Sequence, residues 1–305
     1  MAASLDRSAL FARARTAPFG GSLTQSQVDG INAMLDMAPP DMGSASLAYC
    51  LATAHHETGG AMLPRIENLT YTTAARIRKV WPKRFATEAA AAPYVRNPEA
   101  LANYVYGNRL GNTQPGDGWR FRGMGLVQAT GRDNARRATK RLLALGYLAP
   151  GQDLEATPGL MLDPDISAAM LFVGLAEGWY TGKRLSDYFG PGRDLARDAR
   201  AMVNDDVAAN GAAIARTHAA FKTALLAAGH KPGAVTARIP DAPIAVSPLP
   251  APPHVDPAGP LAPMAPIAAR PPVPDAPVAL PTPAPIASSW RDWLPEAFRR
   301  WMGAA

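Results

Sequence analysis

The sequence predicts a mainly α-helical protein, and three observations support this fold class. Apolar residues recur at intervals of three and four through most of the first 230 residues, as they do on one face of a helix. Residues that favour helix starts precede many of these stretches, and glycine or proline often follows them. The alternation of apolar and polar residues that predicts strands is nowhere convincing, and we find no internal repeat.

The expected helices follow one another along the chain. A short helix over residues 3–16 is followed by one that opens with a capping box at Thr24-Gln-Ser-Gln27. The next helix contains residues 47–57, and Ser44 or Ser46 can cap its start. Later helices are expected over residues 73–80, 99–105, 132–145, 164–179, 194–203 and 211–227. Residues 64–70 and 107–123 are expected as loops, and the helix of residues 164–179 is apolar nearly all round and should be buried.

The helix that ends at Glu57 is the element around which the chain is organised. Glu57 lies three residues beyond Ala54 and extends the apolar face of this helix, and Gly59 and Gly60 supply the left-handed conformation that closes it. Desolvation and the negative end of the helix dipole both disfavour an ionised carboxyl at such a position. A carboxyl in this place is suited to act as a general acid near neutral pH.

Composition limits the class of protein. The 305 residues contain no apolar run long enough to cross a bilayer, and the first residues do not resemble a signal peptide. We therefore expect a chain that is made in the cytoplasm without a signal peptide. The single cysteine, Cys50, excludes an intramolecular disulfide and a cysteine-based metal site. The net charge of +6 favours an anionic partner, such as nucleic acid, an acidic membrane surface or an anionic cell-wall polymer.

The composition changes after residue 230. Nineteen of the 31 prolines lie in the remaining residues, so residues 231–287 are predicted to be a disordered linker rich in proline and alanine. Residues 288–305 form a third segment, in which Trp290, Trp293 and Trp301 belong to an apolar stripe at helical spacing with arginines opposite. This predicts an amphipathic helix that binds an anionic membrane surface, docks on the preceding domain or meets a partner protein.

Two glutamates and several amides form the candidate site. Glu57 ends a helix and Glu67 lies in the following loop, so the two carboxyls can face each other across a cleft, as glycan hydrolysis requires. Arg65 would keep Glu67 ionised, and Gln128, Asn134 and Asn108 are amides of the kind that bind acetamido groups. The His56-Glu57 pair lacks the second histidine of a zinc-protease motif, so we expect no metal and no cofactor.

These motifs resemble glycoside hydrolase family 19, and most of all the chitinase-like lysozymes encoded by phages and prophages. The resemblance covers about residues 5–230 and is carried by the segments His56-Glu-Thr-Gly-Gly60, Pro64-Arg-Ile-Glu-Asn68, Tyr106-Gly-Asn-Arg109 and Arg122-Gly-Met-Gly-Leu-Val-Gln-Ala-Thr-Gly-Arg-Asp-Asn134. It implies a two-lobed lysozyme-like helical domain over residues 1–230 with a central cleft. It also implies inverting hydrolysis of a β-1,4 bond between N-acetylhexosamines.

By position, the resemblance assigns three catalytic residues. Glu57 matches the general acid, Glu67 the general base, and Thr130 the hydroxyl that helps to hold the attacking water. The substrate-contacting amides of the family match Gln128, Asn134 and Asn204.

The expected function is an endolysin-type glycosidase that binds the glycan strands of peptidoglycan. We expect a monomer without a nucleic-acid partner, encoded by a phage or prophage and acting on the cell wall in the periplasm after release. Two alternatives stay open. A chitinase would act on a neutral polymer, whereas the basic charge favours anionic peptidoglycan. An inactive wall-binding module is disfavoured because both glutamates and Thr130 are present.

Overall fold

The computed structural model describes residues 5–204 and 206–232. Within these residues it contains eleven α-helices and four strands of two residues each, so the prediction of a mainly helical domain is confirmed. No helix in this part of the chain has both the length and the apolar character that crossing a membrane requires. The predicted amphipathic helix of residues 288–305, and the predicted linker of residues 231–287 apart from its first two residues, lie outside the described residues.

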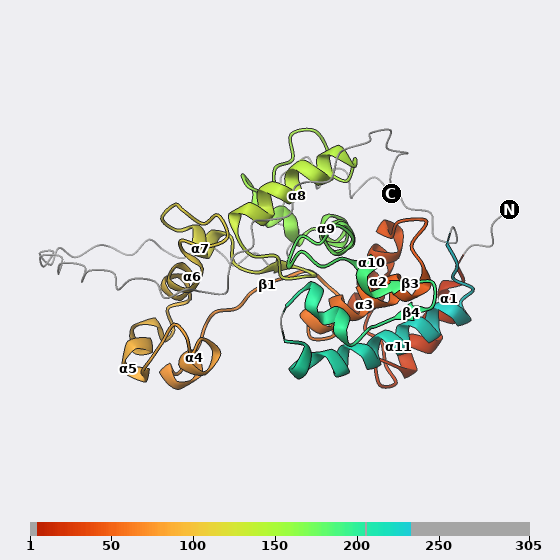
Figure 1. Ribbon diagram of the computed structural model, residues 1–305, viewed down its shortest axis with the longest axis horizontal. Coiled ribbons are helices and arrows are strands. Elements are labelled where there is room, and N and C mark those ends of the chain that lie inside the picture. Colours follow the sequence, from red (N-terminus) through yellow and green to blue (C-terminus); the bar gives the residue numbers. More distant parts are fainter. Residues whose placement is uncertain (1–4, 205, 233–305) are drawn as a thin grey trace, which may run out of the picture. The chain divides into compact units, whose positions relative to one another are not determined.

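Most helices belong to one large hydrophobic core (Figure 1). They are α1 (Arg7–Thr16), α2 (Gln25–Met37), α3 (Ser44–Glu57), α8 (Arg132–Ala144), α9 (Pro164–Glu177) and α11 (Ala212–Ala227). Helix α3 packs along α11, which also contacts α1, while α2 packs against α9. Every residue of α9 from Ile166 to Leu175 is buried, so the expectation for this helix is confirmed. A helix that is apolar on all sides is stable in water only when its neighbours cover all of it.

A second, smaller hydrophobic core is built from residues 69–106. It contains α4 (Ala74–Val80), α5 (Glu88–Ala91) and α6 (Pro98–Tyr106), and α7 (Asp117–Arg120) packs against α6. These four helices are grouped together in Figure 1. Phe85 is fully buried and packs against the rings of Tyr94 and Tyr104, with centroids 5.3 and 5.1 Å away. Aromatic side chains thus supply much of the apolar surface in this small core.

The shortest elements are those that the sequence did not predict. Strand β1 (Arg65–Ile66) pairs antiparallel with β2 (Met124–Gly125), and β3 (Phe189–Gly190) pairs with β4 (Arg193–Asp194). Two residues are too few to show an alternating pattern. Helix α7 lies inside the expected loop of residues 107–123, and α10 (Leu185–Tyr188) was not expected. Residues 194–203 were predicted to form a helix, but only Asp198–Met202 are helical, as a 3₁₀-helix. Other short turns are 3₁₀-helices at Ala92–Tyr94 and Pro158–Leu162 and a π-helical turn at Val207–Gly211.

The start of α3 differs from the prediction, whereas the start of α2 agrees with it. Gly43 precedes α3 and no side chain caps the helix, so the proposed caps at Ser44 and Ser46 are wrong. The hydroxyl of Ser44 lies 2.8 Å from Nδ1 of His230 and so joins α3 to the residues after α11. In α2 the expected capping box is present: Thr24 and Gln27 each accept a hydrogen bond from the other's backbone N–H.

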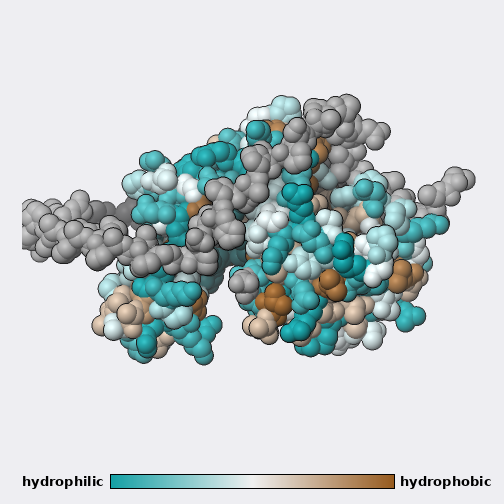
Figure 2. All heavy atoms as spheres, in the orientation of Figure 1, coloured by the Kyte–Doolittle hydropathy of each residue, from teal (hydrophilic) through white to brown (hydrophobic). Residues whose placement is uncertain are grey.

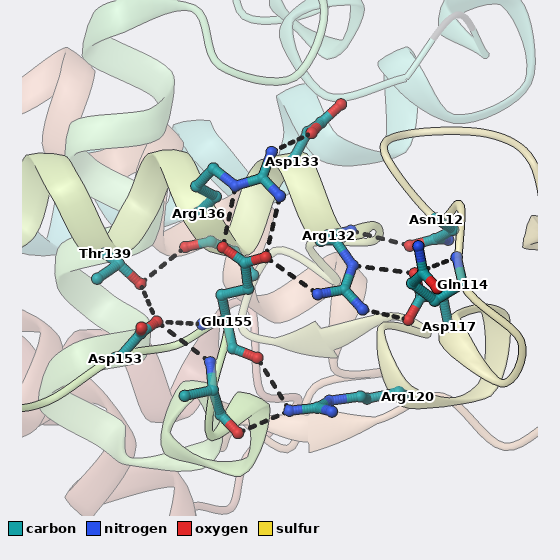
Figure 3. A network of polar contacts seen from close by, with 12 residues as sticks. Asn112, Gln114, Asp117, Arg120, Arg132, Asp133, Arg136, Thr139, Asp153 and Glu155 are labelled. Atoms are coloured by element: carbon teal, nitrogen blue, oxygen red, sulfur yellow. Dashed lines mark hydrogen bonds and ion pairs between the residues drawn. The ribbon is translucent and has the colours of Figure 1, made fainter.

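A network of arginines and acids joins α8 to the loops on either side of it (Figure 3). Arg132 makes a forked contact with Asp117, whose Oδ2 lies 2.9 Å from Nε, and donates to Glu155 across 3.0 Å. Arg136 binds both oxygens of Glu155 at 2.9 Å. The hydrogen bonds from Arg132 hold the pKa of the buried Asp117 carboxyl below its usual value. Forked arginine–carboxylate contacts are among the strongest polar contacts in proteins.

Asp117 should therefore make the stability of the protein depend on pH. Because its pKa is lower in the folded chain, its stabilising contribution is complete above the unfolded value of about 4. That contribution is lost as the pH falls from about 4 through the lower folded pKa. Asp117→Asn should lower the free energy of unfolding by about 2 kcal/mol at pH 7.

Urea unfolding at pH 7 and at several pH values below 4 measures this effect. The difference between wild type and Asp117→Asn should shrink as the pH falls. Asp133→Asn is the control, because Asp133 contacts Arg136 at a site where both side chains are more than half exposed. The control should change the stability by less than about 0.5 kcal/mol. A difference for Asp117→Asn that is the same at every pH would contradict the assignment.

Candidate active site

A cleft of about 540 Å³ lies between residues of the two hydrophobic cores. Tyr71 and Tyr106 on its wall pack on the smaller core, and Val127 and Val203 belong to or pack on the larger one. In the space-filling view the surface is hollowed between the part built from α4 and α5 and the part that contains α11 (Figure 2). The remaining lining residues are Glu57, Arg65, Glu67, Asn68, Gly123, Gln128, Thr130, Arg200 and Asn204.

Glu57 is the last residue of α3 and reaches this cleft, as the sequence predicted. The turn after it is held by Thr58, whose hydroxyl donates to the carbonyl of Ala54 at 2.7 Å and accepts from the N–H of Met62 at 2.9 Å. Gly59 and Gly60 follow with φ values of 63° and 85°, the left-handed conformation expected of them. The chain therefore turns sharply after Glu57 and leaves its side chain at the edge of the cleft, 14% exposed.

Arg200 is the partner of Glu57 that the sequence did not reveal. Its Nη1 donates to Oε1 of Glu57, and its Nε and Nη2 donate to the two carboxylate oxygens of Asp206. The Arg200 side chain is only 5% exposed. Burial lowers the pKa of Arg200, but the hydrogen bonds and negative charges of Asp206 and Glu57 outweigh burial, and the net shift is upward. Arg200 is thus a buried, permanently charged group shared between the side chains of Glu57 and Asp206.

The second carboxylate of Arg200 has a further donor. Asn210 donates from Nδ2 to Oδ2 of Asp206 at 2.6 Å. Burial alone would raise the pKa of Asp206, but the hydrogen bonds from Arg200 and Asn210 hold it below its ordinary value. Asp206 therefore stays ionised and fixes the guanidinium of Arg200 in place beside Glu57.

Glu67 lines the same cleft and is held by a different set of contacts. It follows β1, and its backbone N–H donates to the carbonyl of Gly123 at 2.8 Å. The hydroxyl of Tyr106 lies 2.8 and 3.0 Å from the two oxygens of its carboxylate, and the N–H of Gly123 donates to Oε2 at 3.2 Å. Burial, together with the charge and hydrogen bond of Glu67, raises the pKa of Tyr106 well above its usual value, so its hydroxyl stays a donor.

Arg65 was expected to keep Glu67 ionised, and the structure gives it a different contact. Its Nη1 donates to the carbonyl of Thr58 at 3.2 Å, in the turn after Glu57. Arg65 thereby joins β1 to the end of α3, the two segments that carry the glutamates. The groups that donate to the Glu67 carboxylate are instead Tyr106 and the backbone of Gly123.

The loop after β2 brings Gln128 and Thr130 to the cleft, as predicted. Gln128 has a φ of 52°, and its Nε2 donates to the carbonyls of Arg65 and Gly125 at 2.8 and 2.9 Å. The hydroxyl of Thr130 donates to the carbonyl of Gln128 at 3.0 Å. The amide nitrogen of Gln128 thus holds the two strands together, and its oxygen lies beside Gly123.

The three predicted asparagines lie in different places. Asn204 lines the cleft, next to the segment that carries Arg200. Asn134 and Asn108 are not among the lining residues. Asn134 donates to the carbonyl of Thr130 at 2.8 Å and so supports the loop from behind, while the N–H of Asn108 donates to the carbonyl of Asn112 within its own turn. The expectation that they contact a substrate remains a prediction.

The histidines beside Glu57 do not form part of a ligand cluster. His55 packs edge-on against Phe19, with ring centroids 5.2 Å apart. The described residues contain no group of three or more histidine, cysteine, aspartate or glutamate side chains placed to hold a metal ion.

Part of the chain is similar to a known protein. Over 89 residues the chain is 44% identical to a protein of Haemophilus influenzae described as a glycosyl hydrolase family 19 domain-containing protein. The match covers 28% of this chain and 44% of that protein, so the chain spans less than half the length of the curated relative it matches. No family model matches the chain.

A solved structure is also similar, at a lower level. It is a crystal structure of a chitinase C mutant, with 14% sequence identity and a TM-score of 0.38. The similar region covers 75% of this chain and 94% of that one. The 44% identity over 89 residues is the stronger finding. On that basis, and over that part of its length, the chain is a homologue of a glycosyl hydrolase family 19 domain-containing protein.

Proposed function

We propose that the protein is an inverting glycoside hydrolase that cleaves β-1,4 bonds between the N-acetylhexosamines of peptidoglycan. The observation that carries the proposal is that Glu57 and Glu67 line the same cleft, each held by its own set of donors. Glycosidases need such a pair, one carboxyl to protonate the leaving oxygen and one carboxylate to activate water. The partial homology to a family 19 protein supports the same assignment.

Glu57 is the proposed general acid, and Arg200 assists it. A negative charge develops on Glu57 as its proton passes to the glycosidic oxygen. The guanidinium of Arg200 is already in contact with Oε1 and stabilises that charge without reorganisation of solvent. Because Asp206 shares the same guanidinium, part of the positive charge is balanced before substrate binds.

Glu67 is the proposed general base. The hydroxyl of Tyr106 and the N–H of Gly123 both contact its carboxyl group and fix its orientation. A water molecule between Glu67 and the sugar would lose a proton to this carboxylate, with Thr130 at the cleft wall as a second contact. Attack then comes from the face opposite Glu57 and inverts the anomeric configuration.

The charge and the motifs support the proposed type of enzyme and its proposed substrate. The net charge of +6 favours an anionic glycan, and peptidoglycan carries carboxylates whereas chitin is neutral. Two hydrophobic cores on either side of a polar cleft suit the two-lobed lysozyme-like arrangement of a phage endolysin. Such an enzyme would act on the cell wall after release from the cytoplasm. A chitinase is the alternative enzyme, and an inactive wall-binding module is the alternative of another class.

Digestion of purified peptidoglycan tests this proposal. Mass spectrometry of the released fragments should find a new reducing-end N-acetylhexosamine, whose identity names the bond that is cut. NMR early in the reaction should show the α anomer first. Cleavage of chitin oligosaccharides without cleavage of peptidoglycan would favour the chitinase. A protein that binds peptidoglycan but releases no fragment would favour the binding module, and retention of the β configuration would refute the roles of the two glutamates.

Tyr106 should act as a positioning residue for Glu67. Tyr106→Phe removes the hydroxyl that contacts both carboxylate oxygens but keeps the buried ring. We expect kcat to fall by about 10- to 100-fold, because hydrogen bonds to a charged group contribute about 1.5–3 kcal/mol. KM should change little, since Tyr106 acts on the base rather than on substrate binding.

Steady-state kinetics on soluble peptidoglycan fragments measure kcat and KM separately and so test this expectation. The matched control is Tyr104→Phe on the same helix, which removes an exposed hydroxyl 3.3 Å from the carbonyl of Arg84. The control should keep wild-type kcat and KM. If Tyr106→Phe raises KM and leaves kcat unchanged, Tyr106 contacts the substrate and does not position Glu67.

A further inference from the structure

A run of basic residues covers the outer side of the smaller core. Residues 68–87 contain no aspartate or glutamate. Ile77 is the buried residue of α4, and the basic side chains around it are directed away from the core. We call this set the α4 basic surface, and its members are Arg76, Arg78, Lys79, Lys83 and Arg84. All are exposed except Arg84, which is half-buried.

The charges of this surface are not neutralised within the described residues. None of the ion pairs found there includes a member of the α4 basic surface. Arginines elsewhere, such as Arg132 and Arg200, do have carboxylate partners. A further cation, Arg109, lies near enough that the charge of Arg84 adds to burial in lowering its pKa. Like charges held close together destabilise the free protein, and an anionic ligand would relieve the repulsion.

This surface adjoins the cleft through Tyr71. Tyr71 lines the cleft, and its ring packs edge-on against Trp81, the residue that follows α4, with centroids 5.4 Å apart. Burial and the charge of Glu67 raise the pKa of Tyr71, and the positive charge of Arg76 opposes them. Tyr71 is therefore within electrostatic reach of both Glu67 and Arg76. A polymer in the cleft that contacts Tyr71 therefore comes within electrostatic reach of Arg76, a member of the α4 basic surface.

We propose that the α4 basic surface binds the carboxylates of peptidoglycan stem peptides while the glycan strand occupies the cleft. The proposal rests on the proposed function of the cleft and adds the feature that selects a peptide-substituted strand. The peptides branch from the strand at regular intervals, so a strand in the cleft carries carboxylates past both of its ends. Arginine side chains bind carboxylates through two parallel hydrogen bonds, and lysines add positive charge. Chitin carries no group that this surface would attract.

A pelleting assay with insoluble sacculi free of teichoic acid tests the proposal. The full-length chain is used with Glu57→Gln as parent, so that the sacculi stay intact. The surface variant adds Arg76→Gln, Lys79→Gln and Lys83→Gln. The control variant adds Arg13→Gln, Arg15→Gln and Lys183→Gln, three exposed residues outside the surface that likewise have no ion pair among the described residues. Each protein is also tested on sacculi whose carboxyls have been converted to neutral amides.

The surface variant should bind native sacculi on the order of tenfold more weakly than the parent, because three exposed ion pairs of modest strength are removed together. The control variant should bind as the parent does, and circular dichroism should show equal melting temperatures for all three. On amidated sacculi the parent should bind no more tightly than the surface variant. The proposal would be overturned if the surface variant bound native sacculi as tightly as the parent, or if the control variant lost as much binding as the surface variant. It would also be overturned if amidation of the sacculi left the binding of the parent unchanged.

The assay also separates this proposal from the proposed function. Pelleting requires no hydrolysis, so its outcome does not depend on whether the wild-type protein cleaves a glycan. Failure of the wild type to release fragments from peptidoglycan would refute the glycosidase. Equal binding by the surface variant would refute only the role of the α4 basic surface.

Discussion

Glu57→Gln is expected to reduce the turnover of peptidoglycan by about 10³-fold or more while the protein stays folded. Glutamine has the shape of the protonated acid but cannot give a proton to the leaving oxygen. Bond cleavage depends on that proton, so the loss should appear in kcat rather than in KM. The fold should tolerate the change because the amide oxygen can still accept the hydrogen bond from Arg200.

Turbidity loss of purified sacculi and thermal unfolding measure both parts of this prediction. Glu88→Gln is the matched control, because Glu88 is an exposed residue in the first turn of α5 and does not line the cleft. The control should keep wild-type activity. Near-wild-type turnover by Glu57→Gln would remove Glu57 from the role of general acid.

Arg200→Met should have the largest effect on stability. The methionine fills most of the volume of the arginine but leaves Glu57 and Asp206, at 14% and 27% exposure, without their shared cation. Breaking a buried ion pair by removing one partner costs about 3–5 kcal/mol, since the remaining charge is left desolvated. Activity should fall as well, because the charge that develops on Glu57 loses its stabilising partner.

Urea unfolding at pH 7 checks this expectation. Arg197→Met is the control, since Arg197 is an exposed residue one turn earlier and has no ion pair among the described residues. The control should change the free energy of unfolding by less than about 0.5 kcal/mol. A loss for Arg200→Met no larger than this would mean that Arg200 contributes little to the fold. The contacts of Arg200 with Glu57 and Asp206 would then not be what holds this part of the cleft together.

Features that depend on neighbouring residues could be predicted from the sequence. The capping box of α2, the end of α3 at Glu57 and the left-handed Gly59 and Gly60 are each set by residues within one or two turns. The burial of α9 followed from its own composition. Local hydrogen bonds and steric limits on φ act over a few residues, so they leave a local pattern.

The contacts of the two glutamates were decided only by the tertiary structure. Arg200 is 143 residues from Glu57, and Tyr106 is 39 residues from Glu67. Neither pairing leaves a pattern in the sequence, because a side chain finds a distant partner only after the cores have packed. Arg65 illustrates the same limit: its proximity in sequence suggested Glu67, but its guanidinium reaches Thr58. Local patterns in the sequence thus predict the longer helices, whereas packing determines the short elements and which charged groups meet in the cleft.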